Sequence, residues 1–396
     1  MASTAAVGRS GSCGAMVVGA TVMTKALRVI QVVPSLEGGG VERGVLEVGQ
    51  ALVERGFTSI VISGGGRLVP SLEAGGSQHF EFPVGKKSLM TLLRVRQYRH
   101  LLVNLQPDIV HVRSRLPAWM TYFALRGWPK AQRRPVWLNT VHGLYSVNAY
   151  SAIMTRSVHV IAVSETARRY VLENYSDCPS TRVTVIPRGV DPSAFPYGYQ
   201  ADSGFVEAFC VQHQLGQSAP ILTLPGRFTR LKGHLAFLHA IAKLKAVWPD
   251  VMGLMIGKID GKSAAYVEEL RATIDQLQLH QNVRIIDQVA NIRDVYAMSD
   301  VVLSLSEKPE SFGRTVLEAL SLGVPVVGWA HGGVAEILSN VFPAGAVAQG
   351  DMDGLIERLK AIIREQQRPP EQHPYTLTHS LSMELNLYER LAESFA

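Results

Sequence analysis

The feature that most constrains the fold is a regular alternation of short apolar segments with segments of helical period. In the first half of the chain the apolar segments are residues 27–33, 58–62, 80–82, 109–112, 136–141, 159–163 and 183–186. The second half repeats the pattern at residues 221–224, 253–256, 283–286, 301–305 and 326–328. Strands joined through helices pair in parallel. The sequence therefore predicts an α/β fold of two Rossmann-like, doubly wound parallel-sheet domains that face each other across a cleft.

A stretch rich in proline, glycine and tyrosine, residues 187–220, separates the two series. We expect a first domain over 25–195 and a second over 196–377. The amphipathic segment 380–394 is predicted to be a helix that crosses back onto the first domain, so the region 378–396 is assigned there. Residues 1–24 are interpreted as a disordered leader, with Met23 as an alternative natural start.

Composition excludes several classes of protein. The three cysteines show no metal-ligand spacing and no disulfide framework, which indicates a reducing, cytoplasmic setting. No apolar run reaches the ~20 residues that a membrane-spanning helix needs. No G-x-G-x-x-G follows the first apolar segment, so a nicotinamide cofactor is poorly supported.

Charge is distributed unevenly along the chain. Residues 1–200 carry a net charge of +11 and residues 201–396 a net charge of −5. A basic first half suggests an anionic surface or acceptor, and an unspecific bias of a solvated surface is the alternative. The basic amphipathic run 86–99 fits contact with an anionic membrane or a helix packed on its own sheet. Arg113 and Arg115, at a strand end, are candidates for contact with a phosphorylated acceptor.

Residues 307–338 combine a loop, a helix, a strand and a second helix. Glu310 lies in the opening loop, and the spacing of Thr315 and Glu318 predicts a capping box at the start of the helix. Gly323 is placed to end that helix. Free N–H groups at a helix start bind phosphate, and a neighbouring carboxylate accepts hydrogen bonds from sugar hydroxyls. An ordinary βαβ unit with two solvated glutamates is the alternative interpretation.

Three further side chains are candidates for the same chemistry. Arg227 and Lys232 lie in the loop that follows the apolar segment 221–224, where cations can compensate the charge of a leaving diphosphate. His142 directly follows the apolar segment 136–141 and can hydrogen-bond a sugar hydroxyl or transfer a proton. Surface cations and a structural histidine are the alternatives.

Five motifs in the same order resemble those of retaining GT-B glycosyltransferases of the large family 4. They cover residues 27–340 roughly, and the most specific is the E-x7-E pattern of Glu310 and Glu318. The other four are the glycine loop 37–42, the segment 185–191, the G-R-x4-K-G pattern of 226–233 and the G-G-x-x-E pattern of 332–336.

The resemblance implies a role for individual residues. Gly39 and Gly40 let the backbone approach the donor diphosphate, and Glu318 accepts from the nucleotide ribose. The implied catalytic residues are His142 and Glu310, which contact the transferred sugar. The remaining implied donor-binding residues are Arg227, Lys232, Ser311, Phe312, Gly313, Arg314 and Thr315.

The resemblance also implies the reaction. It is retaining transfer of a sugar from a nucleotide-diphospho-sugar to a glycan or glycolipid acceptor of the cell-envelope type, without metal, other cofactor or nucleic acid, in the cytoplasm or at the inner face of the membrane. A sugar-nucleotide epimerase and a non-catalytic sugar-nucleotide-binding protein are the alternatives.

Two residues depart from the family pattern, and one motif resembles the metal-binding motif of the other glycosyltransferase fold. Arg188 stands where the family has asparagine, and Arg314 stands where an aliphatic residue is common. The D-x-D of Asp351 and Asp353 opens a predicted helix and is interpreted as an N-cap rather than a metal site.

Overall fold

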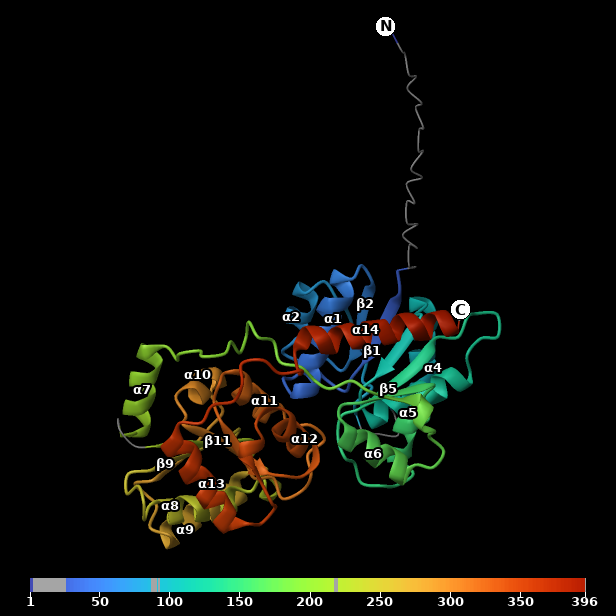
Figure 1. The fold of residues 1–396 in the computed structure, drawn as a ribbon. Coiled ribbons are helices and arrows are strands. Elements are labelled where there is room, and N and C mark those ends of the chain that lie inside the picture. The colour runs from blue at the N-terminus through green and yellow to red at the C-terminus, as the bar shows by residue number, and fades with distance from the viewer. Residues whose placement is uncertain (3–25, 87–90, 92, 217–219, 396) are drawn as a thin grey trace.

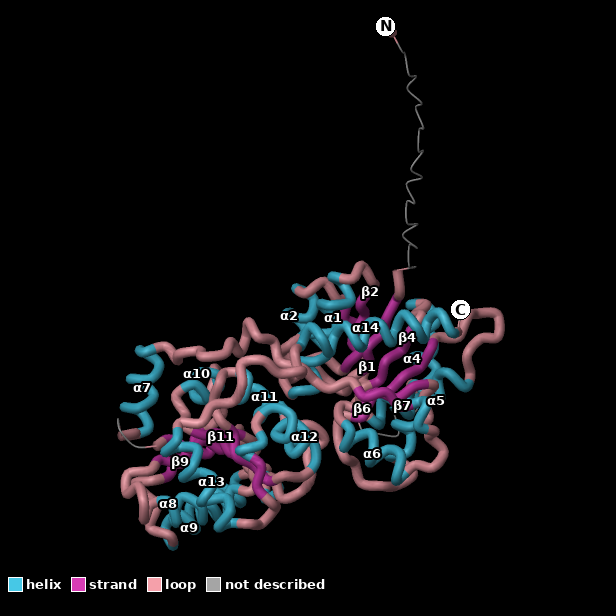
Figure 2. The backbone as a smooth tube through the Cα atoms, viewed as in Figure 1, coloured by secondary structure: helices cyan, strands magenta, loops and turns pink. Residues whose placement is uncertain are grey.

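The chain forms two parallel-sheet domains that are joined by two loop connections (Figures 1 and 2). The computed structural model describes residues 1–2, 26–86, 91, 93–216 and 220–395. Residues 3–24 of the predicted leader lie outside these residues. In the described part of the chain, no helix is both long and apolar enough to cross a membrane.

The first domain is built on a seven-stranded sheet in the order β3-β2-β1-β4-β5-β6-β7, with every pair parallel. Its order reverses between β1 and β4, which is where such sheets open a ligand crevice at the carboxyl ends of the strands. The strands are β1 (Arg28–Val32), β2 (Thr58–Ser63), β3 (Gln78–Glu81), β4 (Ile109–Val112), β5 (Val136–Val141), β6 (His159–Ala162) and β7 (Val183–Val185).

Helices cover both faces of this sheet, as the right-handed crossovers of a parallel sheet require. On α1 the buried residues recur at helical spacing from Gly44 to Leu52, which places one side of the helix against the core. The helices are α1 (Gly40–Glu54), α2 (Val69–Ala74), α4 (Val95–Leu105), α5 (Arg115–Arg126) and α6 (Glu165–Asn174), with short turns η1 (Ser151–Thr155) and η2 (Ser180–Arg182).

The second domain has a six-stranded parallel sheet in the order β10-β9-β8-β11-β12-β13. Its strands are β8 (Ile221–Pro225), β9 (Met252–Ile256), β10 (Val283–Ile286), β11 (Val301–Ser304), β12 (Val326–Trp329) and β13 (Ala346–Val347). Its helices are α7 (Ser203–His213), α8 (His234–Leu244), α9 (Ala264–Gln276), α10 (Ile292–Ala297), α11 (Arg314–Ser321), α12 (Gly332–Val341) and α13 (Met352–Glu365), with turns η3 (Arg230–Lys232) and η4 (Pro343–Gly345). The predicted fold class is confirmed; the short β13 had no sequence signal.

The last helix, α14 (Leu377–Ser394), lies beside α1 on the first domain (Figure 1). Its apolar residues join the core cluster under β1 and β5. The chain reaches it by running alongside the other interdomain connection, where Val190 N donates to Tyr375 O (3.0 Å) and Leu377 N donates to Val190 O (2.9 Å). A side chain at Gly189 would meet the Thr376 carbonyl oxygen at 2.2 Å, so this close crossing requires glycine.

The predicted capping box at Thr315 is wrong. Helix α11 begins at Arg314, and its N-cap is Gly313 with φ of 128°, two residues before the predicted N-cap. The Glu318 carboxylate accepts a hydrogen bond from Arg314 instead of reaching back to a backbone N–H. The N-cap interpretation of Asp351 is confirmed, because its carboxylate accepts from Gly354 N at 2.8 Å.

The basic run 86–99 falls partly outside the described residues, which omit 87–90 and 92. Its described end leads into α4, where Tyr98 and Leu102 are fully buried. That part is a helix packed on its own domain, while Leu93 is 72% exposed.

Candidate functional site

The loops at the carboxyl ends of the two sheets touch each other. Ser311, in the loop after β11, donates a hydrogen bond from Oγ to the carbonyl oxygen of His142 (2.7 Å), which follows β5. Ser164, after β6, donates to the carbonyl oxygen of Ser311 (2.5 Å). Most of the sequence-predicted site residues lie in these loops, so the fold brings the two halves of the predicted site together.

Lys232 and Glu310 form an ion pair in the second domain. Lys232 lies in the loop after β8 and Glu310 in the loop after β11, and Lys232 Nζ is 2.7 Å from Glu310 Oε1. Ser306 Oγ donates to the same carboxylate oxygen. Burial raises the pKa of Glu310, but Lys232, the Ser306 hydrogen bond and His331 together lower it below its ordinary value. The Glu310 carboxylate is therefore ionised beside Lys232, and each side chain remains about a quarter exposed (25% and 26%).

Two helix N-termini lie next to this ion pair. The loop that carries Glu310 packs on the start of α12, where Gly333 N donates to the Glu310 carbonyl oxygen (2.7 Å). A side chain at Gly333 would meet the Phe312 backbone at 2.4 Å, so only glycine permits this contact. Helix α11 starts at the end of the same loop without a side-chain cap. Its first N–H groups are thus available to an anion.

Arg314 connects α11 to the first domain. Its Nε donates to Glu318 Oε1 (3.0 Å), one turn along α11. Its Nη2 donates to Glu47 Oε1 on α1 (3.1 Å). Its Nη1 also donates to the Gly40 carbonyl oxygen (3.3 Å). Burial raises the pKa of Glu318 and Arg314 opposes that rise, leaving the pKa above its ordinary value. Arg314, one of the two residues that depart from the family pattern, therefore bridges the two domains.

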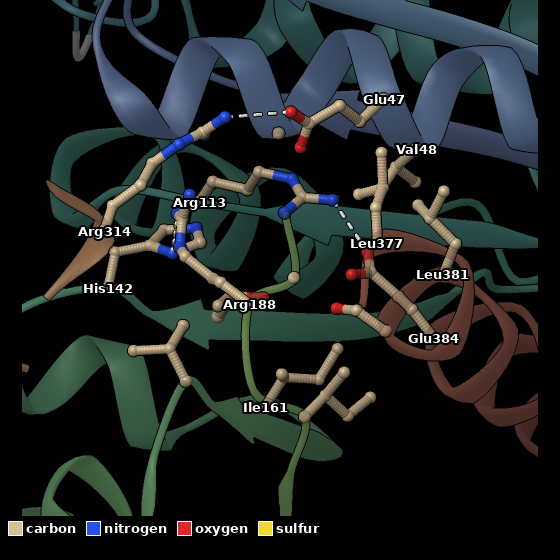
Figure 3. A pocket seen from close by; sticks show the side chains of 16 residues that line it. Glu47, Val48, Arg113, His142, Ile161, Arg188, Arg314, Leu377, Leu381 and Glu384 are labelled. Atoms are coloured by element: carbon tan, nitrogen blue, oxygen red, sulfur yellow. Dashed lines mark hydrogen bonds and ion pairs between the residues drawn. The ribbon is translucent and has the colours of Figure 1, made fainter. Parts of the chain in front are cut away.

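Arg188, the other departure, contacts the glycine loop and also His142, beside which it lies in Figure 3. Its Nη1 donates to the Gly40 carbonyl oxygen (2.6 Å), and its Nη2 lies 2.7 Å from His142 Nδ1. A guanidinium group only donates, so Nδ1 accepts and the proton of the neutral imidazole is assigned to Nε2. Burial, together with Arg188, Arg113 and His111, lowers the pKa of His142 well below its ordinary value.

His142 is thus a neutral hydrogen-bond donor in the cleft. Its Nε2 is buried and has no hydrogen-bond partner among the described residues. Of the two roles predicted for it, the structure favours donation to a sugar hydroxyl over proton transfer, since a strongly lowered pKa disfavours the protonated form. Beside it lies a cavity of about 40 Å³, lined among others by Arg113, Arg188 and Glu47 (Figure 3). That volume holds water molecules but no sugar.

Arg227 and Arg230 differ in their surroundings. Arg227 is exposed in the loop before Lys232, and no hydrogen bond or ion pair ties it to the described residues. Gly226, with φ of 152°, lies against the Lys232 side chain, which brings the start of this loop close to the ion pair. Arg230 pairs instead with Glu269 of α9 on the surface, so it faces away from the cleft.

Four residues that shape this site were assigned no role from the sequence. Glu47 binds Arg314, Ser306 binds Glu310, and Ser164 binds the loop of Ser311. Glu336 accepts from the backbone N–H groups of Glu165 (2.9 Å) and Thr166, which joins α12 to α6 of the first domain. Only Glu336 had a signal, the G-G-x-x-E pattern; the others depend on contacts between distant segments.

The described residues contain no group of three or more His, Cys, Asp or Glu side chains that could hold a metal ion. The aspartates of the D-x-D pattern have other partners. Asp351 caps α13, and Asp353 lies 2.6 Å from Lys243 Nζ. The cleft presents cations, helix N–H groups, carboxylates and the neutral imidazole of His142.

Comparison with known proteins agrees with the domain structure. The profile described as Glycosyltransferase Family 4 matches residues 38–194, and the profile described as Glycosyl transferases group 1 matches residues 207–376. A crystal structure of a glycosyltransferase from Rickettsia africae ESF-5 is 30% identical, with a TM-score of 0.79, over 93% of this chain and 99% of that one.

Two curated relatives match over shorter lengths. The N-acetyl-alpha-D-glucosaminyl L-malate synthase of Bacillus anthracis is 28% identical over 156 residues, 39% of each chain. One subunit of the human phosphatidylinositol N-acetylglucosaminyltransferase is 25% identical over 322 residues, which are 76% of this chain and 61% of the relative. The chain thus spans less than two thirds of the length of these relatives. From the two profiles and the structural match, the chain belongs to the GT-B glycosyltransferases, with a family 4 domain followed by a group 1 domain.

Proposed function

We propose that the protein transfers a sugar from a nucleotide-diphospho-sugar to a glycan or glycolipid acceptor with retention of the anomeric configuration. The observation that carries this proposal is the pair of Lys232 and Glu310, 2.7 Å apart beside the uncapped start of α11. A cation and free N–H groups suit a diphosphate, and the adjacent carboxylate suits the hydroxyls of the sugar attached to it.

In this proposal the donor lies along the second sheet's carboxyl edge. Lys232 and Arg227 bind the diphosphate together with the backbone N–H groups of Gly313, Arg314 and Thr315. Glu318 accepts from the ribose, and it keeps Arg314 as a partner because a carboxylate has several acceptor positions. Gly39 and Gly40 allow the first domain to approach the diphosphate, since a side chain there would occupy part of the cleft.

Binding of the donor exchanges one set of partners for another. Lys232 and Glu310 neutralise each other in the donor-free protein. The incoming diphosphate takes over Lys232, and the sugar hydroxyls take over the Glu310 carboxylate. Because each side chain is only about three quarters buried, water can reach both groups while the partners change.

The transfer itself breaks the bond between the anomeric carbon and the diphosphate oxygen and forms a bond from that carbon to the acceptor oxygen. The acceptor hydroxyl gives its proton to the departing diphosphate oxygen, which leaves from the same face of the sugar. Departure and attack on one face pass through an oxocarbenium-like state. Lys232 and the α11 N–H groups stabilise the negative charge that develops on the diphosphate. Glu310 and the Nε2–H of His142 orient the sugar from opposite domains.

The sugar, the acceptor and the location are also part of the proposal. The two curated relatives described above are named for N-acetylglucosamine derivatives, so UDP-N-acetylglucosamine is the first donor to test. A glycolipid acceptor would be met at the inner face of a membrane. Leu93 and the exposed Arg94 and Arg96 next to it support peripheral contact with anionic lipid, which vesicle co-sedimentation of the full chain would detect.

A donor panel tests the function. The melting temperature is measured with UDP-, GDP- and ADP-sugars, because a ligand that binds only the folded protein raises it. The best donor is then incubated with acceptors, and products are identified by mass spectrometry and by the anomeric coupling in NMR. We expect transfer with retention, lost in Lys232→Ala and Glu310→Ala. An epimerised nucleotide sugar without acceptor product, or full activity in both variants, contradicts the proposal.

A further inference from the structure

Three arginines lie at the carboxyl edge of the first sheet, but their charges are not compensated equally. Arg113 and Arg115 follow β4, and Arg188 follows β7. Arg113 is buried, lies 2.7 Å from Glu384 and donates to Gln31 (3.0 Å). Its charge is used within the fold, so the acceptor contact predicted for Arg113 is unsupported. Arg115 and Arg188 have no carboxylate partner among the described residues.

Arg115 is held in place by neutral groups. Its Nη1 donates to Ser151 Oγ (3.2 Å), and its guanidinium lies over the rings of Tyr145 (4.5 Å) and Tyr150 (5.4 Å). Stacking on aromatic rings orients a guanidinium without neutralising it. Arg115 is also the first residue of α5, whose first turn contains no acidic residue and no side-chain cap. The electrostatic field at this end of the helix is therefore positive from two sources.

Arg188 lies in an environment that is positive overall. Its hydrogen-bond acceptors are a carbonyl oxygen and a neutral imidazole, and the nearby glutamates, Glu47 and Glu384, are bound to Arg314 and Arg113. Burial and the like charges of Arg314 and Arg113 lower the pKa of Arg188 to about 10. An additional anion beside Arg188 would relieve this repulsion.

The two uncompensated arginines flank one loop. Tyr145 lies under Arg115, and a side chain at Gly143 would meet the Tyr145 ring at 3.3 Å, so the ring packs close to this loop. Arg188 lies 2.7 Å from His142 Nδ1 at the start of this loop, and Arg115 lies 4.5 Å from the centre of the Tyr145 ring three residues later. Burial raises the pKa of Tyr145, and the hydrogen bond to the His142 backbone and the charges of Arg115 and Arg188 oppose that rise. The unpartnered Nε2–H of His142 belongs to the same loop. An anion between the arginines would thus be next to the sugar position.

We propose that the acceptor carries an oxyanion, a phosphate monoester or a carboxylate, which Arg115 and Arg188 bind beside Tyr145. A planar guanidinium offers paired N–H donors that match either group. The donor diphosphate has its own cations on the second domain, so the first-domain arginines are left for the acceptor. Anchoring this charge orients the acceptor hydroxyl toward the anomeric carbon near His142. The inference rests on the proposed function, whose acceptor it defines.

Calorimetric titration of phenylphosphonate tests the anion site directly. The protein is first saturated with the nucleoside diphosphate that stabilises it most, so the donor phosphate position is occupied. We expect phenylphosphonate to bind and the neutral benzyl alcohol not to bind. Arg115→Gln and Arg188→Gln should each weaken binding about 10- to 100-fold, the loss typical of a charge-assisted hydrogen bond. Arg126→Gln, at the opposite exposed end of α5, is the matched control and should bind as the unaltered protein does.

Transfer assays with paired acceptors identify the oxyanion. L-malate is compared with 1,2,4-butanetriol, and glucose 6-phosphate with glucose, using the donor found in the panel. We expect the charged member of one pair to be preferred. The KM of this charged acceptor should rise in Arg115→Gln, while the KM of the donor changes by less than about twofold. The KM of the charged acceptor should rise less in Arg115→Lys than in Arg115→Gln, because lysine keeps the positive charge.

Two results overturn the inference. One is a failure of the phenylphosphonate titration, with binding either undetectable at about 10 mM or unchanged in both variants. A single anion site is expected to bind with a Kd of about 1 mM, so binding should be detectable at that concentration. The other is equal or better transfer to the neutral acceptors. Failure of the proposed function looks different, because then no nucleotide sugar is turned over, even by hydrolysis, in the unaltered protein. A nucleotide-induced rise in melting temperature in each variant confirms that its second domain is folded.

Discussion

Two arginine–glutamate networks join distant parts of this chain, and they differ in their exposure to water. In the first, Arg113 pairs with Glu384 of α14, and their side chains are 3% and 9% exposed. In the second, Arg314 pairs with Glu47 across the domain boundary, and their side chains are 22% and 27% exposed. The first lies within one domain and the second lies between two, beside the proposed donor site.

The buried network is completed by several neutral groups. Glu384 accepts from Tyr388, which lies 2.6 Å from His111 Nδ1, and His111 Nε2 lies 2.6 Å from Thr140 Oγ1. Burial raises the pKa of Glu384, but Arg113, His111 and Tyr388 together hold it well below the ordinary value. Such a network stabilises one arrangement, because each partner that leaves exposes an uncompensated charge to a dry interior. The partly hydrated network can exchange partners, which ligand binding requires.

The largest effect should come from breaking the buried network. Glu384→Ala leaves the Arg113 charge without its partner, and we expect a loss of about 3–5 kcal/mol in the free energy of unfolding. Chemical denaturation followed by far-UV circular dichroism measures it. Glu389→Ala is the matched control five residues further along α14, because its pair with Arg55 is more exposed to water and should be worth about 0.5 kcal/mol. Equal losses in the two variants would show that burial does not distinguish the networks.

The next effect concerns catalysis rather than stability. Lys232→Ala removes the cation proposed to stabilise the leaving diphosphate, and we expect kcat to fall about 10²- to 10³-fold. The melting temperature should change little, because Lys232 is partly exposed. Steady-state transfer assays provide the measurement. Lys243→Ala, which breaks the exposed pair with Asp353, should leave kcat unchanged. A large loss of stability with unaltered kcat in Lys232→Ala would place this pair with the structural network instead.

Arg314→Leu should have a smaller effect, and on donor binding. The substitution restores the aliphatic type common in the family and removes the bridge from Glu318 to Glu47. Glu318 then loses the cation that opposes the rise of its pKa, so it is a poorer partner for the ribose. We expect the KM of the donor to rise about tenfold, the equivalent of one charge-assisted hydrogen bond. A fall in KM would mean that Arg314 competes with the donor for Glu318.

The smallest effect is on the pH dependence of stability. Burial, followed by the charge of Arg113, lowers the pKa of His111 to about 4 from an ordinary value of 6.5. Between these values the unfolded chain binds more protons than the folded one, so stability falls as the pH drops from 6.5 to about 4. His111→Asn should reduce this slope by up to about 1.4 kcal/mol per pH unit. The same series on the exposed His280→Asn should match the unaltered protein; an unchanged slope in His111→Asn would contradict the assignment.

Below pH 4.5 a second group contributes. Glu384 has a lowered pKa, so its stabilisation is present above the ordinary carboxyl value and is lost as the pH falls through the folded value. Melting temperatures of Glu384→Gln between pH 7 and pH 3 would therefore decline less steeply at the acid end than those of the unaltered protein.

The two networks also show how far the sequence could be interpreted. Glu310 and Lys232 could be selected because each lies in a loop after an apolar strand, and parallel strands bring such loops to one edge. Arg314 was recognised as unusual, but its partner Glu47 was not, since nothing in a helix pattern says which exposed glutamate faces another domain. Arg113 was assigned to the acceptor because Glu384, 271 residues away, carried no signal of its own.

By itself, the sequence of this protein determined two α/β domains, the strand ends that carry the site and the glycines that let those loops approach one another. These features depend on local periodicity and backbone conformation, which neighbouring residues encode. Only the tertiary structure decided which charges are neutralised: Arg113 by Glu384, Arg314 by Glu47 and Glu318, and Arg115 and Arg188 by no described carboxylate. The physical reason is that an ion pair depends on the distance between side chains and on their burial, and both arise only when distant segments have packed together.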